Sequence, residues 1–145
     1  MTVKQPVATP LDSPLTFNHI ALALSGGGFR AAAYHLGTLN ILYLLGLLDR
    51  VHMLSTVSGG SIIGAFYTLK SKMGVDFATI YNQFYDFLST DELLENAVDT
   101  WKKACESGSQ NYKLIQAFAQ VYDEYLFDHQ PFGALWEHGQ HTHLD

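Results

Sequence analysis

The chain has 145 residues, of which 48% are hydrophobic and 15% are charged. This composition suits one packed globular core and excludes an intrinsically disordered chain. The formal net charge of −6 and the lack of a basic patch argue against nucleic-acid binding and against electrostatic docking on anionic lipid. The single cysteine, Cys105, excludes an internal disulfide framework and is consistent with a reducing compartment.

Two segments bear on targeting and membrane insertion. Residues 1–18 are polar and contain prolines, so we expect a lead-in segment rather than a secretory signal. Residues 31–48 carry no charge and just reach the length of a membrane span, but they include His35 and Asn40 and follow a glycine-rich turn. We therefore expect a helix buried between a sheet and its neighbours. The absence of a secretory signal and of a membrane span predicts a cytoplasmic protein. An apolar surface could still contact a membrane peripherally.

Two short apolar runs, residues 20–24 and 51–57, are each followed by a glycine-bearing turn and a segment of helical length. Continuous apolar runs of this kind are typical of strands buried on both faces. We predict helices at 30–45 and 60–72, with Gly46 as the cap of the first. Strand, helix, strand and helix with short links predict a parallel pair of strands joined by a right-handed crossover.

From residue 75 onwards, aromatic and apolar residues recur at helical spacing. Three such stripes predict three helices, and a capping box at residues 89–92 precedes the second. The stripes are Phe77, Ile80, Tyr81, Phe84 and Leu88 in the first helix, Leu94, Ala97, Val98 and Trp101 in the second, and Ile115, Phe118, Tyr122 and Tyr125 in the third. We interpret the stripes as core-facing sides of helices, and we predict no cofactor. Pro131 could open one more short helix.

The turn at residues 56–60, here called the Ser58 turn, stands between a predicted strand and a predicted helix. This is the setting of a nucleophile elbow, in which a serine projects from the end of a sheet near the positive end of the next helix. Gly59 and Gly60 would let the backbone turn tightly. The pattern G-x-S-x-G is imperfect, because Thr56 stands in place of its first glycine.

A second glycine-rich turn lies upstream, again between a predicted strand and a predicted helix. Three successive glycines, Gly26, Gly27 and Gly28, form what we call the glycine loop (residues 26–28). Such a loop can direct backbone N–H groups towards one point and hold an oxyanion. Arg30 follows, where its cation could orient the loop or meet an anionic head group. A nucleophile and an anion-stabilising loop on neighbouring turns predict acyl transfer.

The glycine loop also permits a different interpretation. Gly26, Gly28 and Ala31 fit the loose dinucleotide fingerprint G-x-G-x-x-G/A, and Asp49 stands about 20 residues further on. However, the ribose-binding acid should follow the second strand, whereas Asp49 precedes it. A dinucleotide site would also leave the Ser58 turn unexplained. It remains an alternative.

The histidines offer two further alternatives. A catalytic triad in the order Ser–Asp–His could be completed from Asp123, Asp128, His129, His138, His141 and His143. In α/β-hydrolases, however, several strands precede the elbow, and here only one does. The last three histidines could bind a metal, but no predicted rigid element would fix their geometry, so we expect a solvated loop and no metal site. We expect His35 and His52 to be structural.

The two turns resemble those of a known family. Residues 25–37, SGGGFRAAAYHLG, resemble the oxyanion-loop signature of patatin-like phospholipases. Residues 55–61, STVSGGS, resemble their nucleophile elbow, in which a threonine in place of the first glycine is familiar. Residues 125–128 and 132–135 resemble the next segment more weakly. The resemblance implies a three-layer α/β/α fold with a parallel central sheet, only partly supplied by this chain.

The resemblance also implies a lipid acyl hydrolase that uses a serine–aspartate dyad. Ser58 would attack a lipid ester carbonyl, the glycine loop would hold the oxyanion, and an aspartate would accept the serine proton. The resemblance places that aspartate in a downstream Asp-Gly motif, but this chain contains no Asp-Gly pair, and nothing indicates that Asp145 takes its place. We therefore predict that residues 19–145 are the N-terminal part of an incomplete domain, inactive on its own.

Three explanations for the missing base stay open. The chain could be part of a longer enzyme, or one piece of a split enzyme whose second chain brings the aspartate. It could also be a short protein that uses the scaffold without turnover. The last explanation provides a second functional hypothesis, a non-catalytic lipid-binding or interaction module.

Overall fold

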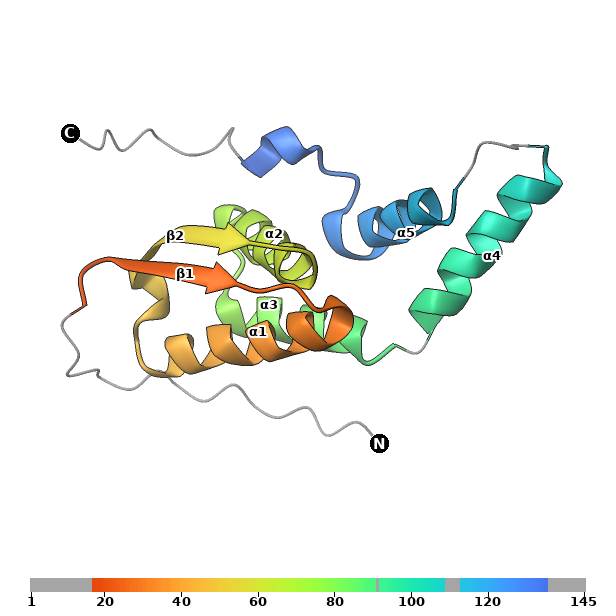
Figure 1. Ribbon diagram of the computed structural model, residues 1–145. Helices are drawn as coiled ribbons and strands as arrows, with labels where there is room; N and C mark the ends of the chain where they lie inside the picture. Colours follow the sequence, from red (N-terminus) through yellow and green to blue (C-terminus); the bar gives the residue numbers. More distant parts are fainter. Residues whose placement is uncertain (1–16, 91, 109–112, 136–145) are drawn as a thin grey trace. The chain divides into compact units, whose positions relative to one another are not determined.

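The computed structural model describes residues 17–90, 92–108 and 113–135. The chain divides into two compact units, Met1–Tyr85 and Asp86–Asp145. The strands and helices follow in the order β1 (Ile20–Leu24), α1 (Gly28–Leu44), β2 (Val51–Thr56), α2 (Gly59–Lys72), α3 (Phe77–Leu88), α4 (Glu92–Glu106) and α5 (Leu114–Tyr122) (Figure 1). Short 3₁₀ helices at Leu48–Arg50 and Phe132–Leu135 and a π-helix at Asp123–Phe127 complete the described elements.

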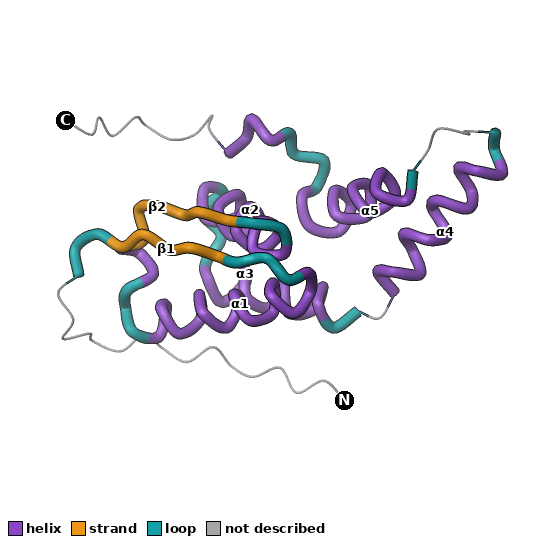
Figure 2. Tube along the Cα trace, in the orientation of Figure 1, coloured by secondary structure: helices purple, strands orange, loops and turns teal. Residues whose placement is uncertain are grey.

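β1 and β2 form a parallel two-stranded sheet, which confirms the predicted strand pair. Leu22 pairs with Leu54 and Leu24 with Thr56, and the Val57 N–H donates to the Leu24 carbonyl at 3.0 Å. Because the strands run in the same direction, their carboxyl ends lie at one edge. The loops that follow both strands therefore lie side by side (Figure 2). The mixed α/β arrangement is that of a partial α/β/α fold.

α1 begins at Gly28, slightly earlier than predicted, and ends as the sequence indicates. Gly46 has φ 64°, and its N–H donates to the Tyr43 carbonyl at 2.9 Å, while the Leu47 N–H reaches the Leu42 carbonyl at 2.8 Å. These two bonds form a Schellman motif, which satisfies carbonyls that the helix end leaves free. The predicted glycine cap is confirmed.

The core of the first unit lies between α1, α2, α3 and one face of the sheet. Its most buried side chains are Leu24, Ala32, Leu36, Leu39, Ile63, Phe66, Leu69, Ile80 and Phe84. The rings of Phe66 on α2 and Phe84 on α3 lie 5.3 Å apart. The expectation that the α3 stripe faces the core is confirmed by its buried residues.

The sheet is buried on one face only, which corrects the expectation of strands buried on both. Leu24 and Leu54 face α2, where Gly64 lies against both side chains. Ala21, Ala23 and Met53 on the other face are exposed. The reason is that α1 packs on α2, so both helices occupy the Leu24 side of the sheet.

α1 is likewise covered on one side, which corrects the expectation of an enclosed helix. Ala32, Leu36 and Leu39 are buried, but Tyr34 is 73% exposed, and Ile41 is exposed as well. The sheet, α2 and α3 leave the side of α1 that carries Tyr34 and Ile41 uncovered. Among the described residues, no helix is both long enough and apolar enough to span a membrane.

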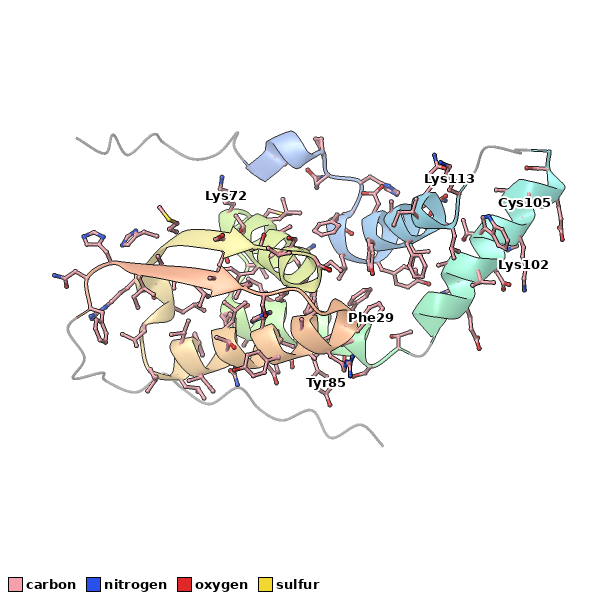
Figure 3. The ribbon with its side chains drawn as sticks, in the orientation of Figure 1. Phe29, Lys72, Tyr85, Lys102, Cys105 and Lys113 are labelled. Atoms are coloured by element: carbon pink, nitrogen blue, oxygen red, sulfur yellow. The ribbon has the colours of Figure 1, made fainter. Side chains whose placement is uncertain are left out.

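In the second unit, α4 packs on α5. Among its described residues, the buried apolar side chains are Phe87, Ala97, Ala117, Val121 and Leu126. Asn96 Nδ2 donates to the Tyr125 hydroxyl at 3.0 Å. The buried face of α5 is rotated relative to the predicted stripe, so Ile115 and Tyr125 are exposed. Tyr125 lies beyond the end of α5, in the π-helix, where the α-helical spacing no longer applies. Figure 3 shows Cys105 on α4, where its thiol is exposed.

The short helix expected after Pro131 is present as Phe132–Leu135. Several sequence-based expectations lie outside the described residues. These are the lead-in up to residue 16, Asp91 of the capping box, His138, His141, His143 and Asp145.

Candidate active site

The Ser58 turn and the glycine loop lie directly against each other. A Cβ added to Gly26 would be 3.2 Å from the Cβ of Ser58. The hydrogen bond from Val57 to Leu24 continues the strand ladder up to this point. The parallel register of β1 and β2 therefore brings together two turns that are about 30 residues apart in the sequence.

Ser58 has a backbone conformation that residues with a side chain rarely adopt. Its φ is 52° and its ψ is −120°, in the region that favours glycine. Its carbonyl accepts hydrogen bonds from the Ser61 N–H at 2.7 Å and the Ile62 N–H at 3.3 Å, so the backbone of Ser58 starts α2. The Ser58 side chain is exposed and makes no capping hydrogen bond to α2. The Ser58 hydroxyl therefore does not cap α2, although capping is the usual role of a serine at the start of a helix.

Gly59 and Gly60 let the two turns approach backbone to backbone. A Cβ on Gly59 would collide with the carbonyl of Gly28. A Cβ on Gly60 would lie 2.5 Å from the Leu24 carbonyl oxygen. Both positions therefore require glycine, because a side chain would collide with the neighbouring backbone.

The threonine that departs from the G-x-S-x-G pattern is accommodated by α2. The Ser61 hydroxyl donates to Thr56 Oγ1 at 3.0 Å. A Cβ added to Gly64 would lie 2.7 Å from the methyl carbon of Thr56. Gly64 supplies the space that a glycine at position 56 would otherwise provide, and Ser61 satisfies the extra hydroxyl. Sequence reasoning did not assign Ser61 this role, because the contact depends on how α2 packs on β2.

The glycine loop carries N–H groups at the start of α1. Gly27 and Gly28 have φ values of 143° and 61°, so both depend on the conformational freedom of glycine. The first N–H groups of a helix have no partner within that helix. Together with the helix dipole, such groups bind anions. The loop and Arg30 are exposed, so a ligand can reach them.

Within residues 17–85, no carboxylate lies beside Ser58. Between residues 17 and 85 the acidic residues are Asp49 and Asp76. Asp76 accepts hydrogen bonds from the Thr79 N–H at 3.0 Å and the Thr79 hydroxyl at 2.6 Å, which lower the pKa of its carboxyl. Asp49 precedes the six-residue β2, so about 20 Å of strand separates it from the Ser58 turn. Its position before β2 also leaves the dinucleotide interpretation without its ribose-binding acid.

The second unit contains an aspartate–histidine pair. The Nδ1 of His129 and the Oδ2 of Asp123 are 2.7 Å apart, and this hydrogen bond raises the pKa of His129 above its usual value. Asp128 and His129 both have positive φ, at 49° and 57°. The prediction of a triad through this histidine is not tested, because Ser58 belongs to the first unit. Among the described residues, no group of His, Cys, Asp or Glu could hold a metal ion.

The chain is thus an α/β protein in which a parallel strand pair brings two glycine-rich turns together at its carboxyl ends. One of these turns carries an exposed serine at a positive φ. The family model described as patatin-like phospholipase matches residues 22–136, which is more than half of the chain and includes both turns. The chain therefore belongs to the patatin-like phospholipase family, whose members are lipid acyl hydrolases. Neither the curated proteins nor the solved structures compared with it gave a match.

Proposed function

We propose that this chain supplies the nucleophile and the oxyanion loop of a lipid acyl hydrolase. The observation that carries the proposal is the backbone of Ser58, with φ 52° and ψ −120°, directly beside Gly26. Positive φ at a residue other than glycine persists only where the surrounding structure imposes it, and such residues cluster at active sites. Family membership supports the same chemistry.

In the proposed reaction, Ser58 Oγ attacks the carbonyl carbon of a lipid ester while a carboxylate accepts its proton. The carbonyl oxygen becomes an oxyanion, which the N–H groups of the glycine loop hold. The intermediate then expels the alcohol, which takes a proton from the carboxylic acid, and leaves an acyl-serine. Water, deprotonated by the same carboxylate, hydrolyses this ester. Loss of one oxyanion donor typically reduces the rate by about 10²–10³.

The carboxylate in this reaction comes from outside residues 17–85. Asp49 and Asp76 lie elsewhere, and the resemblance implies an aspartate in a later segment. We propose that a further part of the protein, or a second chain, brings it to Ser58. The intact mass of the purified protein and of every chain that co-purifies with it tests this. If the complete assembly contains these 145 residues and no other protein segment, the proposal of an external carboxylate is contradicted.

The surroundings of the two turns support a lipid substrate. Val57 before the nucleophile position and Phe29 after the glycine loop are exposed, and Phe29 lies on the first turn of α1 (Figure 3). Exposed apolar side chains beside a catalytic turn can contact a membrane surface peripherally. Arg30 is exposed on the same turn, and in this proposal its guanidinium meets an anionic head group.

Labelling with a fluorophosphonate, which reacts with activated serines, tests the proposal. The complete protein should be labelled, and Ser58→Ala should abolish the labelling. Ser61→Ala is the matched control, because its hydroxyl lies in the same turn but is bonded to Thr56. Labelling that survives in Ser58→Ala would refute Ser58 as the nucleophile.

A second candidate is a lipid-binding module without turnover. The absence of an acid beside Ser58 within residues 17–85 favours it. This candidate predicts that the complete, folded assembly is not labelled, yet co-sediments with phosphatidylcholine vesicles, and that Ser58→Ala leaves this binding unchanged. Strong labelling would exclude it.

A further inference from the structure

His35 is a buried polar side chain that the proposed chemistry does not use. It lies on α1, is 4% exposed, and points back to the residue that precedes the glycine loop. Its Nε2 is 3.1 Å from the carbonyl oxygen of Ser25 and 3.2 Å from the Ser25 hydroxyl. Within the described part of the chain, its Nδ1 is buried without a hydrogen-bond partner.

These contacts define the tautomer of His35. A carbonyl oxygen can only accept, so the nitrogen that bonds it must carry a proton. The ring therefore donates from Nε2 to the Ser25 carbonyl. The donor is directed at the backbone, which makes the bond independent of the side chain at position 25.

The Ser25 carbonyl occupies a critical place in the site. It lies between His35 and the first turn of α2, since a Cβ on Gly60 would come within 2.8 Å of this oxygen. The same peptide unit contains the Gly26 N–H. A peptide unit is planar and trans, so its N–H points opposite to its carbonyl. The bond to His35 thereby directs the Gly26 N–H away from His35.

Without this bond, the Ser25–Gly26 peptide could rotate at low cost. Gly26 has no side chain, and Gly27 and Gly28 already use conformations that glycine alone adopts freely. The far end of the loop is held by a long hydrogen bond of 3.4 Å from the Ala31 N–H to the Gly27 carbonyl. An oxyanion donor is effective because it is oriented before the reaction. A loop of three glycines needs an external contact to maintain that orientation.

We infer that His35 is a positioning residue, whose Nε2–H holds the Ser25 carbonyl and so orients the Gly26 N–H and the glycine loop for the oxyanion. The inference rests on the proposed function of that loop. His35 does not touch the substrate. Its role is to prevent rotation of one peptide unit.

Two variants separate the donor from the bulk of the ring. His35→Phe keeps an aromatic ring but has no donor, whereas His35→Gln keeps an N–H near the position of Nε2. In the complete protein, with a soluble ester as substrate, His35→Phe should lower kcat by about 10²–10³, the effect of losing one oxyanion donor. Its KM should change by less than about threefold, because ground-state binding does not need the oxyanion donor. His35→Gln should recover most of kcat.

A trifluoromethyl ketone forms an oxyanion on the serine, so its affinity reports on the oxyanion donors. A residue with a purely structural role would leave this affinity unchanged. Its affinity for His35→Phe should fall by the same factor as kcat. Thr38→Ala is the control, because it removes an α1 hydroxyl that donates to the Tyr34 carbonyl of the same helix, and it should keep kcat within about threefold. If His35→Phe loses thermal stability but retains kcat and inhibitor affinity, the inference is wrong.

Nuclear magnetic resonance tests the inference without turnover. Ring ¹⁵N shifts of the unmodified protein should show a proton on Nε2 of His35, and a proton on Nδ1 instead would overturn the inference even if His35→Phe does not fold. The Gly26 amide resonance should shift and broaden in His35→Phe but not in His35→Gln. If this pattern holds while Ser58→Ala keeps full turnover, the proposed nucleophile fails and the positioning role of His35 stands. If Ser58→Ala is inactive and the Gly26 resonance is the same in all variants, only the His35 inference fails.

Discussion

Replacing Ser58 with glycine should make the protein more stable than replacing it with alanine. The φ of 52° at this position costs a residue with a side chain about 1–3 kcal/mol, and both serine and alanine bear that cost. Glycine avoids this cost, but its greater conformational freedom in the unfolded chain lowers the free energy of unfolding by about 0.4–1 kcal/mol. Ser58 is exposed, so little buried surface changes. The expected difference between the variants is about 1 kcal/mol in favour of glycine, a shift of about 4 °C in Tm for a chain of this size.

Denaturant titration of the complete protein carrying Ser58→Ala or Ser58→Gly measures this difference. Ser55 provides the control, because it is exposed within β2 and pairs with Ala23 in ordinary strand geometry. There, glycine should be less stable than alanine by about 0.5–1 kcal/mol. The prediction is thus a reversal of sign between positions 58 and 55. If glycine destabilises at both, the Ser58 turn is not strained and the argument for a nucleophile elbow loses its basis.

Gly60→Ala would place a Cβ 2.5 Å from the carbonyl oxygen at the end of β1, and denaturant titration should show a loss of about 1–3 kcal/mol. Gly37→Ala, inside α1 with nothing within 4 Å of the new Cβ, should gain about 0.5–1 kcal/mol, and equal effects would contradict the close contact of the turns. Hydrogen bonds at the start of α3 lower the pKa of Asp76, so its contribution to stability is present above the usual carboxyl pKa and lost as pH falls through the lowered value. Thermal melts should therefore show Asp76→Ala less stable than the unmodified protein at neutral pH, with the two converging in acid, and a constant difference would be inconsistent with this. The hydrogen bond to Asp123 raises the pKa of His129, so its stabilising effect is full below the usual histidine pKa and lost as pH rises through the raised value. A ¹H–¹⁵N titration should show His129 losing its proton at higher pH than an ordinary exposed histidine, and Asp123→Asn should shift the titration to lower pH; an unchanged midpoint would refute the pairing.

Much of the local structure could be predicted because its causes are local. The apolar runs predicted β1 and β2 to within one residue, and Gly46 predicted the end of α1. The burial of these elements could not be predicted in the same way. An apolar run such as β1 shows that a strand can be buried on both faces, but a second layer must be present to cover Ala21 and Ala23.

The same division applies to the candidate site. The sequence by itself determined the two glycine-rich turns, the serine between strand and helix, and the lack of an Asp-Gly pair, because sterics and hydrogen bonding restrict which residues can form such turns. The tertiary structure alone decided that Gly26 lies against Ser58, that Gly64 makes room for Thr56, and that His35 holds the Ser25 carbonyl. These contacts join residues that are distant in the chain or on different elements. They follow from the parallel register of β1 and β2 and from the packing of α1 and α2, which no local pattern encodes.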